Sequence, residues 1–172
     1  RLVREDIARL AQATSGGRPL PEPLLDEIVA RTDGVPLFVE ELCKALLEAG
    51  VVIERHGRLE LARALKVTEI PATLRDSLTA RLDRLGGAKA VAQLASVLGR
   101  DFGYPLLRAV SGAPDPDLDA QLAVLKRAEI LLQRGLPPNA HYVFKHALIQ
   151  EAAYDTLLKS SRLQNHRPDP ET

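Results

Sequence analysis

The stretch Thr32-Asp33-Gly34-Val35-Pro36-Leu37-Phe38-Val39-Glu40-Glu41-Leu42 decides how the chain is divided. Its Gly-x-Pro turn opens an amphipathic helix, because the fixed φ and missing N–H of Pro36 suit the first turn of a helix. Gly34 relieves the chain reversal just before that turn. By itself the pattern indicates only a well-made helix start. Because it stands between polar, Pro-rich helical material and a following hairpin, it predicts a joint between two substructures.

Three short helices are predicted to form a helical subdomain over residues 1–50. Apolar residues recur at helical spacing in residues 3–13, in 22–31 and from Pro36 to about Ala49, and Gly50 ends the third helix. Cys43 is the single cysteine, so the chain can form no internal disulfide. Its place on the third helix predicts a small buried apolar residue.

Residues 51–70 are predicted to form a β-hairpin and a linker. Two strand-like runs flank His56-Gly57, a two-residue turn with glycine where positive φ is needed. His56 is interpreted as a turn residue, because no partner for a metal or catalytic role is near. Ile70-Pro71 then opens a helix over residues 73–85 with leucines at spacings of four, four and three. Its interspersed arginines and acids, Arg81 among them, are interpreted as a solvated face.

The order of elements over residues 71–162 is typical of a winged helix. Three helices are predicted, and after them two strands, over 130–134 and 141–145. A last helix is expected from about His146 to Lys159, and residues 163–172 are expected to be a disordered tail. The predicted fold class is therefore mainly α, with a small helical subdomain followed by a winged-helix domain with short β-hairpins.

Composition excludes several classes of function. Lys plus Arg and Asp plus Glu both number 23, so no whole-molecule field attracts nucleic acid or acidic membranes. Aromatic residues make up 3% of the chain and there is no Trp, which leaves few stacking platforms for bases or sugars. The sequence has no apolar run long enough for a membrane span and no signal-peptide layout, so we expect no membrane partner and a cytoplasmic localisation.

The motifs of an independent enzyme are missing from this sequence. It has no phosphate loop, no Gly-x-Gly-x-x-Gly and no nucleophile elbow, so no catalytic residue is predicted. His141 and His146 are five residues apart, but no acid or cysteine is close enough in sequence to complete a metal site. The chain starts at Arg1 and contains no Met, which suggests a piece of a longer polypeptide.

Three motifs in this order resemble the second half of a STAND-class, AAA+-like signalling ATPase. The sequence is most similar to the ATPase modules of bacterial multidomain adenylate/guanylate cyclases and of large LuxR-type regulators. The resemblance extends to about Arg162 and implies a helical lid followed by a winged helix, both closing over ATP or ADP on a P-loop core upstream of Arg1. The motifs are Gly34-Val35-Pro36-Leu37-Phe38-Val39-Glu40-Glu41-Leu42, Ile70-Pro71-Ala72-Thr73-Leu74 and Tyr142-Val143-Phe144-Lys145-His146-Ala147-Leu148-Ile149-Gln150-Glu151-Ala152-Ala153-Tyr154.

The resemblance implies cofactor-binding roles for Gly34, Pro36 and His146. In that family the proline of the Gly-x-Pro motif packs by the nucleotide base, and a histidine after the wing approaches the phosphates of ADP. Ala147 stands where the plant and animal relatives have Asp. The parent protein would be an ATPase, and a nucleotide cyclase if that is its output domain. This segment alone is not expected to bind ATP or ADP tightly.

Three interpretations stay open at this point. In the first, nucleotide controls an output domain, a cyclase or a transcription regulator, and the partners are the upstream core and that output domain of the same polypeptide. In the second, the chain is a DNA-binding winged-helix regulator. The helix that would enter the major groove begins Asp117-Leu118-Asp119 and would repel phosphates, which disfavours DNA as a partner. The third interpretation is a purely structural helical adaptor.

Overall fold

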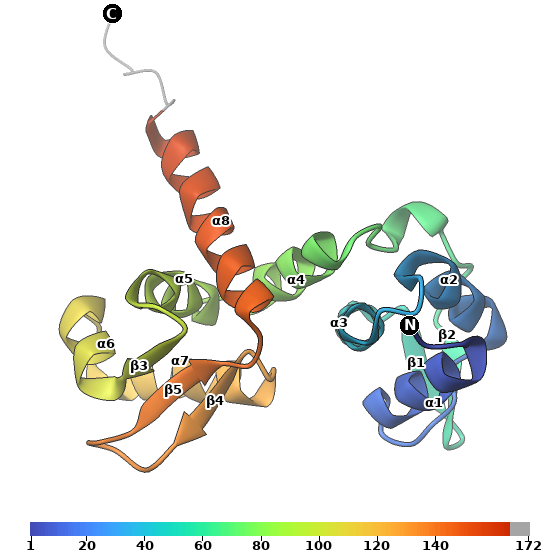
Figure 1. Cartoon of the computed structure of the whole chain (residues 1–172), viewed down its shortest axis with the longest axis horizontal. Coiled ribbons are helices and arrows are strands. Elements are labelled where there is room, and N and C mark those ends of the chain that lie inside the picture. Colours follow the sequence, from blue (N-terminus) through green and yellow to red (C-terminus); the bar gives the residue numbers. More distant parts are fainter. Residues whose placement is uncertain (166–172) are drawn as a thin grey trace, which may run out of the picture. The chain divides into compact units, whose positions relative to one another are not determined.

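The computed structural model describes residues 1–165, with side chains to residue 163, and divides the chain into two compact units between Arg84 and Leu85 (Figure 1). The described part is mainly helical, with small antiparallel sheets of short strands, as the sequence predicts. None of its helices is both long enough and apolar enough to cross a bilayer.

Three helices and a hairpin surround the core of the first unit. The third helix, α3, contributes the most fully buried side chains, including Cys43, which is 0% exposed as predicted. The helices are α1 (Arg4–Thr14), α2 (Glu22–Thr32) and α3 (Pro36–Glu48). The core includes Ile7, Ala11, Leu24, Ile28, Phe38, Val39, Leu42 and Leu46.

The predicted hairpin is present as strands β1 (Val52–Arg55) and β2 (Arg58–Leu61), which pair antiparallel. Both turn residues have positive φ, 52° at His56 and 74° at Gly57. Such turns match the right-handed twist of the two strands. The linker after the hairpin contains a short 3₁₀ turn, η1 (Val67–Glu69), which the sequence analysis does not predict.

Helix α4 (Leu74–Asp83) completes the first unit by packing on α3. The Thr73 side chain caps it by accepting a hydrogen bond from the Asp76 backbone N–H at 3.0 Å. This packing explains why the units divide after residue 84, whereas the sequence analysis begins the second domain at residue 71. The prediction of a solvated face is wrong for Arg81, which is 1% exposed, because carboxylates of α3 meet its guanidinium there.

The second unit has a three-stranded antiparallel sheet in the order β3-β5-β4. Strand β3, three residues long, is absent from the sequence prediction. The two predicted strands are β4 and β5, joined by the loop 135–140. The elements are α5 (Ala88–Leu98), β3 (Asp101–Gly103), α6 (Tyr104–Ser111), α7 (Asp115–Arg127), β4 (Leu131–Arg134), β5 (His141–Phe144) and α8 (Ala147–Asn165).

Helix α8 is longer than the sequence pattern predicts. It continues through Asn165, so residues 163–165 of the predicted disordered tail are helical. The remaining tail residues, 166–172, lie outside the described residues. In Figure 1 the C-terminal half of α8 extends past the rest of its unit.

Helix α5 buries its small side chains. The buried positions are Ala88, Ala92, Ala95 and Ser96. The larger apolar residues that predict the helix lie elsewhere: Val97 is 57% exposed, and Val91 and Leu94 are half-buried. Small residues on the inner side allow α7 and α8 to approach closely, which leaves a second apolar face of α5 outside the core.

Candidate functional site

Gly34 occupies a position that only glycine fits. Its φ is +71°, and a Cβ atom there would lie 2.8 Å from the backbone N of Leu2 and closer still to the Leu2 carbonyl oxygen. The Leu2 N–H also donates a hydrogen bond to the Gly34 carbonyl at 2.8 Å. Because these are backbone atoms, they cannot rotate aside. The structure therefore assigns Gly34 to packing of the N-terminal segment against the α2–α3 junction.

Pro36 lies exposed in the first turn of α3, beside Val35, which is 39% exposed. The Val35 N–H donates to the Thr32 carbonyl at 2.9 Å, which fixes the turn. The Thr32 side chain is buried, and its Oγ1 has no hydrogen-bond partner among the described residues. The Val35-Pro36 step therefore presents a small apolar edge at a helix start, a surface that can flank a planar ring.

His146 stands between β5 and α8 in the second unit, whereas Gly34 and Pro36 lie together in the first. Its carbonyl oxygen accepts a hydrogen bond from the Ile149 N–H at 3.1 Å, so it marks the start of α8. The side chain is half-buried, and Nε2 is shielded from water with no hydrogen-bond partner in the described part of the chain. A shielded imidazole nitrogen of this kind can bond to a ligand. The side chain of Ala147, which follows it, offers no polar atom.

A buried ionic cluster lies between α3 and α4, where the sequence predicts a solvated face. The Arg81 guanidinium donates to the carboxylate of Glu41, and both side chains are excluded from water, at 1% and 0% exposed. Arg81 also bonds Glu48 Oε1 at 3.3 Å, and Lys44 Nζ lies 3.5 Å from Glu41 Oε1.

Burial raises the pKa of the Glu48 carboxyl, although Arg81 acts in the opposite direction. The cluster joins α3 to α4 through ion pairs. Removal of one charged partner is strongly destabilising, because the other charge stays buried. A signal for it exists in the sequence, since Glu41, Lys44 and Glu48 recur at i, i+3 and i+7 on one side of α3.

A groove of about 290 Å³ opens in the second unit between α5, α7 and the segment before α7. Its lining is mainly apolar, and none of the residues that the resemblance selects lies in it. Asp117 and Gln121 of α7 supply carboxylate and amide groups to the same lining. We call this the α5–α7 groove; it is lined by Ala90, Val91, Leu94, Ala113, Leu118 and Gln121, with Gly87, Ser111 and Asp117.

Comparison with known proteins finds one informative similarity. The chain is 32% identical over 154 residues to an uncharacterized protein of Rhizobium meliloti (strain 1021). The match covers 86% of this chain and 14% of that protein, so the chain spans about one seventh of its relative's length. No family model matches the chain, and no solved structure matches it.

Proposed function

We propose that this chain is the lid and winged-helix part of a STAND-class signalling ATPase. In this proposal the first unit is the lid, and the second unit carries the winged helix. Both act on ATP or ADP bound to a P-loop core elsewhere in the polypeptide. The exchange of ADP for ATP shifts the population between closed and open arrangements and thereby controls an output domain, a cyclase or a transcription regulator.

The topology of the second unit supports the winged-helix part of the proposal. Its elements run α5, β3, α6, α7, β4, β5, and β3 pairs with β5 at the sheet edge opposite β4. A three-helix arrangement interrupted by a short strand and closed by a hairpin is the order of a winged helix. The acidic first turn of α7, with Asp115 and Asp117, favours a role in protein packing over DNA binding.

The single observation that carries the nucleotide role is the unpartnered Nε2 of His146 at the start of α8. A bound nucleotide supplies phosphate oxygens, which are the acceptors that an imidazole N–H lacks here. Pro36 offers its exposed ring to the base. Gly34 acts indirectly, by holding the turn that presents Pro36. The similarity to about one seventh of a long Rhizobium protein supports a segment of a multidomain polypeptide.

The test uses the parent polypeptide with its upstream core. We expect His146→Ala to weaken ADP binding about tenfold, or roughly 1.4 kcal/mol, the size of one charge-assisted hydrogen bond, and to raise the output activity. His141→Ala is the matched control, because His141 is an exposed histidine on the neighbouring strand β5.

Isothermal titration with ADP and ATP measures the affinities, and the output assay measures the switch. Unchanged affinity and unchanged output in His146→Ala would remove His146 from the site. If the wild-type parent binds no nucleotide at all, the chain is better described as a helical adaptor.

A further inference from the structure

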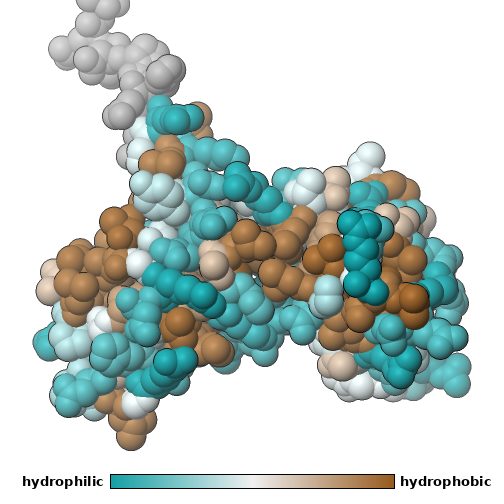
Figure 2. All heavy atoms as spheres, in the orientation of Figure 1, coloured by the Kyte–Doolittle hydropathy of each residue, from teal (hydrophilic) through white to brown (hydrophobic). Residues whose placement is uncertain are grey.

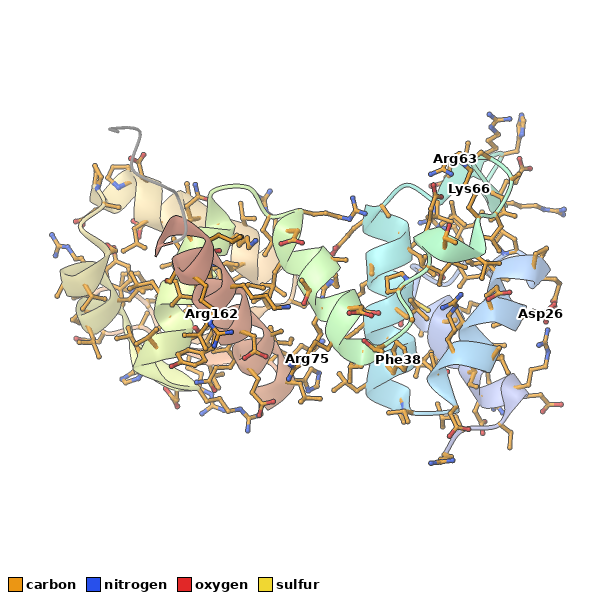
Figure 3. The ribbon with its side chains drawn as sticks, turned by 90° about the horizontal axis from the view of Figure 1, so that it is seen from above. Asp26, Phe38, Arg63, Lys66, Arg75 and Arg162 are labelled. Atoms are coloured by element: carbon orange, nitrogen blue, oxygen red, sulfur yellow. The ribbon has the colours of Figure 1, made fainter. Side chains whose placement is uncertain are left out.

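Helix α4 is attached to the first unit mainly through one other helix. It packs on α3 (Figure 3), and its leucines Leu78 and Leu82 are 2% and 1% exposed. Neither of them belongs to the cluster of buried residues to which α1, α2, α3 and the hairpin contribute, and only Leu74 touches the margin of that cluster. Helix α4 is therefore an addition to the core of the first unit rather than a part of it.

Charged side chains make up much of the contact between α3 and α4. Arg81 and Glu41 are 1% and 0% exposed, and Glu48, which accepts from Arg81 at 3.3 Å, is 33% exposed. Ion pairs elsewhere in this unit stay in contact with water: Arg4 and Asp26, for example, are 47% and 63% exposed. Figure 2 shows hydrophilic side chains (teal) on the surface of the unit. The contact between α3 and α4 differs because it excludes an ion pair from water.

A contact that buries an ion pair separates more readily than an apolar contact of the same size. Each ion gives up several kcal/mol of hydration free energy when it is buried. When α4 moves away from α3, water returns to Arg81 and Glu41, and their hydration offsets part of the lost attraction. Two apolar surfaces gain nothing comparable when water returns to them. The buried charges therefore lower the free energy of a state in which α4 is detached.

The segments at both ends of α4 permit such a movement. Before the helix, Ile70 is 4% exposed and belongs to the core, whereas Ala72 and Thr73 are exposed. After the helix, Gly86 has φ +58°, and a Cβ atom there would have no other atom within 4 Å. Packing of these segments therefore does not hold α4 in place.

A detached α4 would also lose its helical structure. It has 10 residues, and isolated helices shorter than about 12–15 residues are marginal in water. The Thr73 cap stabilises only its N-terminal end. Detachment therefore opens the amides of α4 to hydrogen exchange with the solvent.

We propose that α4 is a releasable clamp, which detaches from α3 while α1, α2, α3 and the hairpin stay folded. The Arg81–Glu41 pair sets the balance between the docked and the detached state. Because the chain passes from α4 into the second unit, release moves the last fixed point of the first unit from Arg84 back to Ile70. The clamp therefore controls the length of the connection between the two units. Its release requires no nucleotide, so it is independent of the proposed nucleotide site.

Hydrogen exchange of the 172-residue chain, read by mass spectrometry of its peptides, tests the proposal. Relative to their intrinsic rates, the amides of α4 should exchange at least tenfold faster than those of α1. Their exchange should also depend less steeply on urea, because detachment of one helix exposes less surface than unfolding of the whole unit. Equal rates and equal urea dependence for α4 and α1 in the wild type would overturn the proposal.

Variants at Arg81 give the decisive measurement. In Arg81→Met the amides of α4 should lose their protection, whereas those of α1 stay protected. Arg81→Lys keeps the charge but loses the planar fork that joins Glu41 to Glu48, so it should accelerate α4 exchange at least tenfold. The double variant Arg81→Met with Glu41→Leu should restore the protection of α4.

Arg63→Met is the matched control, because Arg63 forms an exposed ion pair with Glu69 at 2.6 Å in the linker before α4. This variant should leave the exchange of α4 unchanged. Protection of α4 that persists in both Arg81 variants would overturn the proposal. An Arg81→Met chain in which α1 loses its protection together with α4 would also overturn it, because the first unit would then open only as a whole.

Discussion

The guanidinium of Arg81 donates to the carboxylate of Glu41 at a place that water does not reach. The pair joins α4 to α3, the helix that the Gly-x-Pro turn opens, and Figure 3 shows the two helices side by side. Glu48 and Lys44 extend the pair into a cluster of four charged side chains. Because Arg81 and Glu41 are both buried, removal of Arg81 takes away the hydrogen-bonded partner of the Glu41 carboxylate and leaves the 3.5 Å contact with Lys44 as its compensation.

Arg81→Met should therefore destabilise the first unit by about 3–5 kcal/mol. Urea unfolding followed by circular dichroism measures the loss. The control is the double variant Arg81→Met with Glu41→Leu, which replaces both charges by apolar groups and should recover most of the lost stability. A loss below about 1 kcal/mol in the single variant would show that Glu41 finds water or another cation in its place.

Gly34→Ala should cost more than the same change at another glycine of similar conformation. At Gly34 the new methyl group is destabilised by the positive φ, and it also clashes with the Leu2 backbone. Gly57 has φ +74°, and a Cβ atom there would have no other atom within 4 Å, so Gly57→Ala carries only the conformational cost of roughly 1–2 kcal/mol. The difference between the two unfolding free energies isolates the clash with Leu2. Equal losses would mean that the N-terminal segment simply moves away.

Above pH 10 the free energy of unfolding should decrease with rising pH because of Tyr104. Its hydroxyl bonds Asp119 at 2.8 Å, and this bond, together with burial, raises the pKa of Tyr104 to about 12. The folded state therefore holds this proton more tightly than the unfolded state, whose tyrosine pKa is about 10. The stabilisation is complete below pH 10 and is lost as the pH rises toward 12.

Tyr104→Phe is the matched variant, and it should cost about 1 kcal/mol near neutral pH. Wild type and variant are compared by urea unfolding at several pH values, and the phenolate absorbance near the end of the range reports the titration directly. The difference in unfolding free energy between wild type and Tyr104→Phe should be constant up to pH 10 and should decrease above it. A difference that stays constant to pH 12 would contradict the role of the Asp119 bond.

Cys43 should resist thiol reagents in the folded protein. Its side chain is 0% exposed, and burial raises the pKa of the thiol to about 12, with Glu40 adding to the rise. Since the thiolate is the reactive form, labelling requires opening of the first unit. The labelling rate should increase with urea in parallel with unfolding. Arg81→Met should label faster than wild type under native conditions, whereas rapid labelling of the folded wild type would contradict the burial.

Local patterns in the sequence were sufficient for most helices and for both hairpins. Pro36 at a helix start, His56-Gly57 between two strand-like runs and the leucines of α7 each act through neighbours within a few residues, so their spacing predicts the element. Strand β3 could not be found in this way. It is three residues long and exists because Phe102 pairs with Tyr142, which lies far along the chain.

The sequence by itself determined the order of the helices and of the two hairpins, the apolar faces and the turn that opens α3, because propensity and periodicity act locally. Only the tertiary structure decided which faces are covered. It placed Arg81 inside, since α3 presents Glu41 and Glu48 at the same spot; it left the large apolar residues of α5 facing a groove, since small residues pack better inside. Packing partners that are distant in sequence determine both outcomes: the charged residues at i, i+3 and i+7 on α3 mark one side of that helix, but their spacing does not say that Arg81 of α4 packs there.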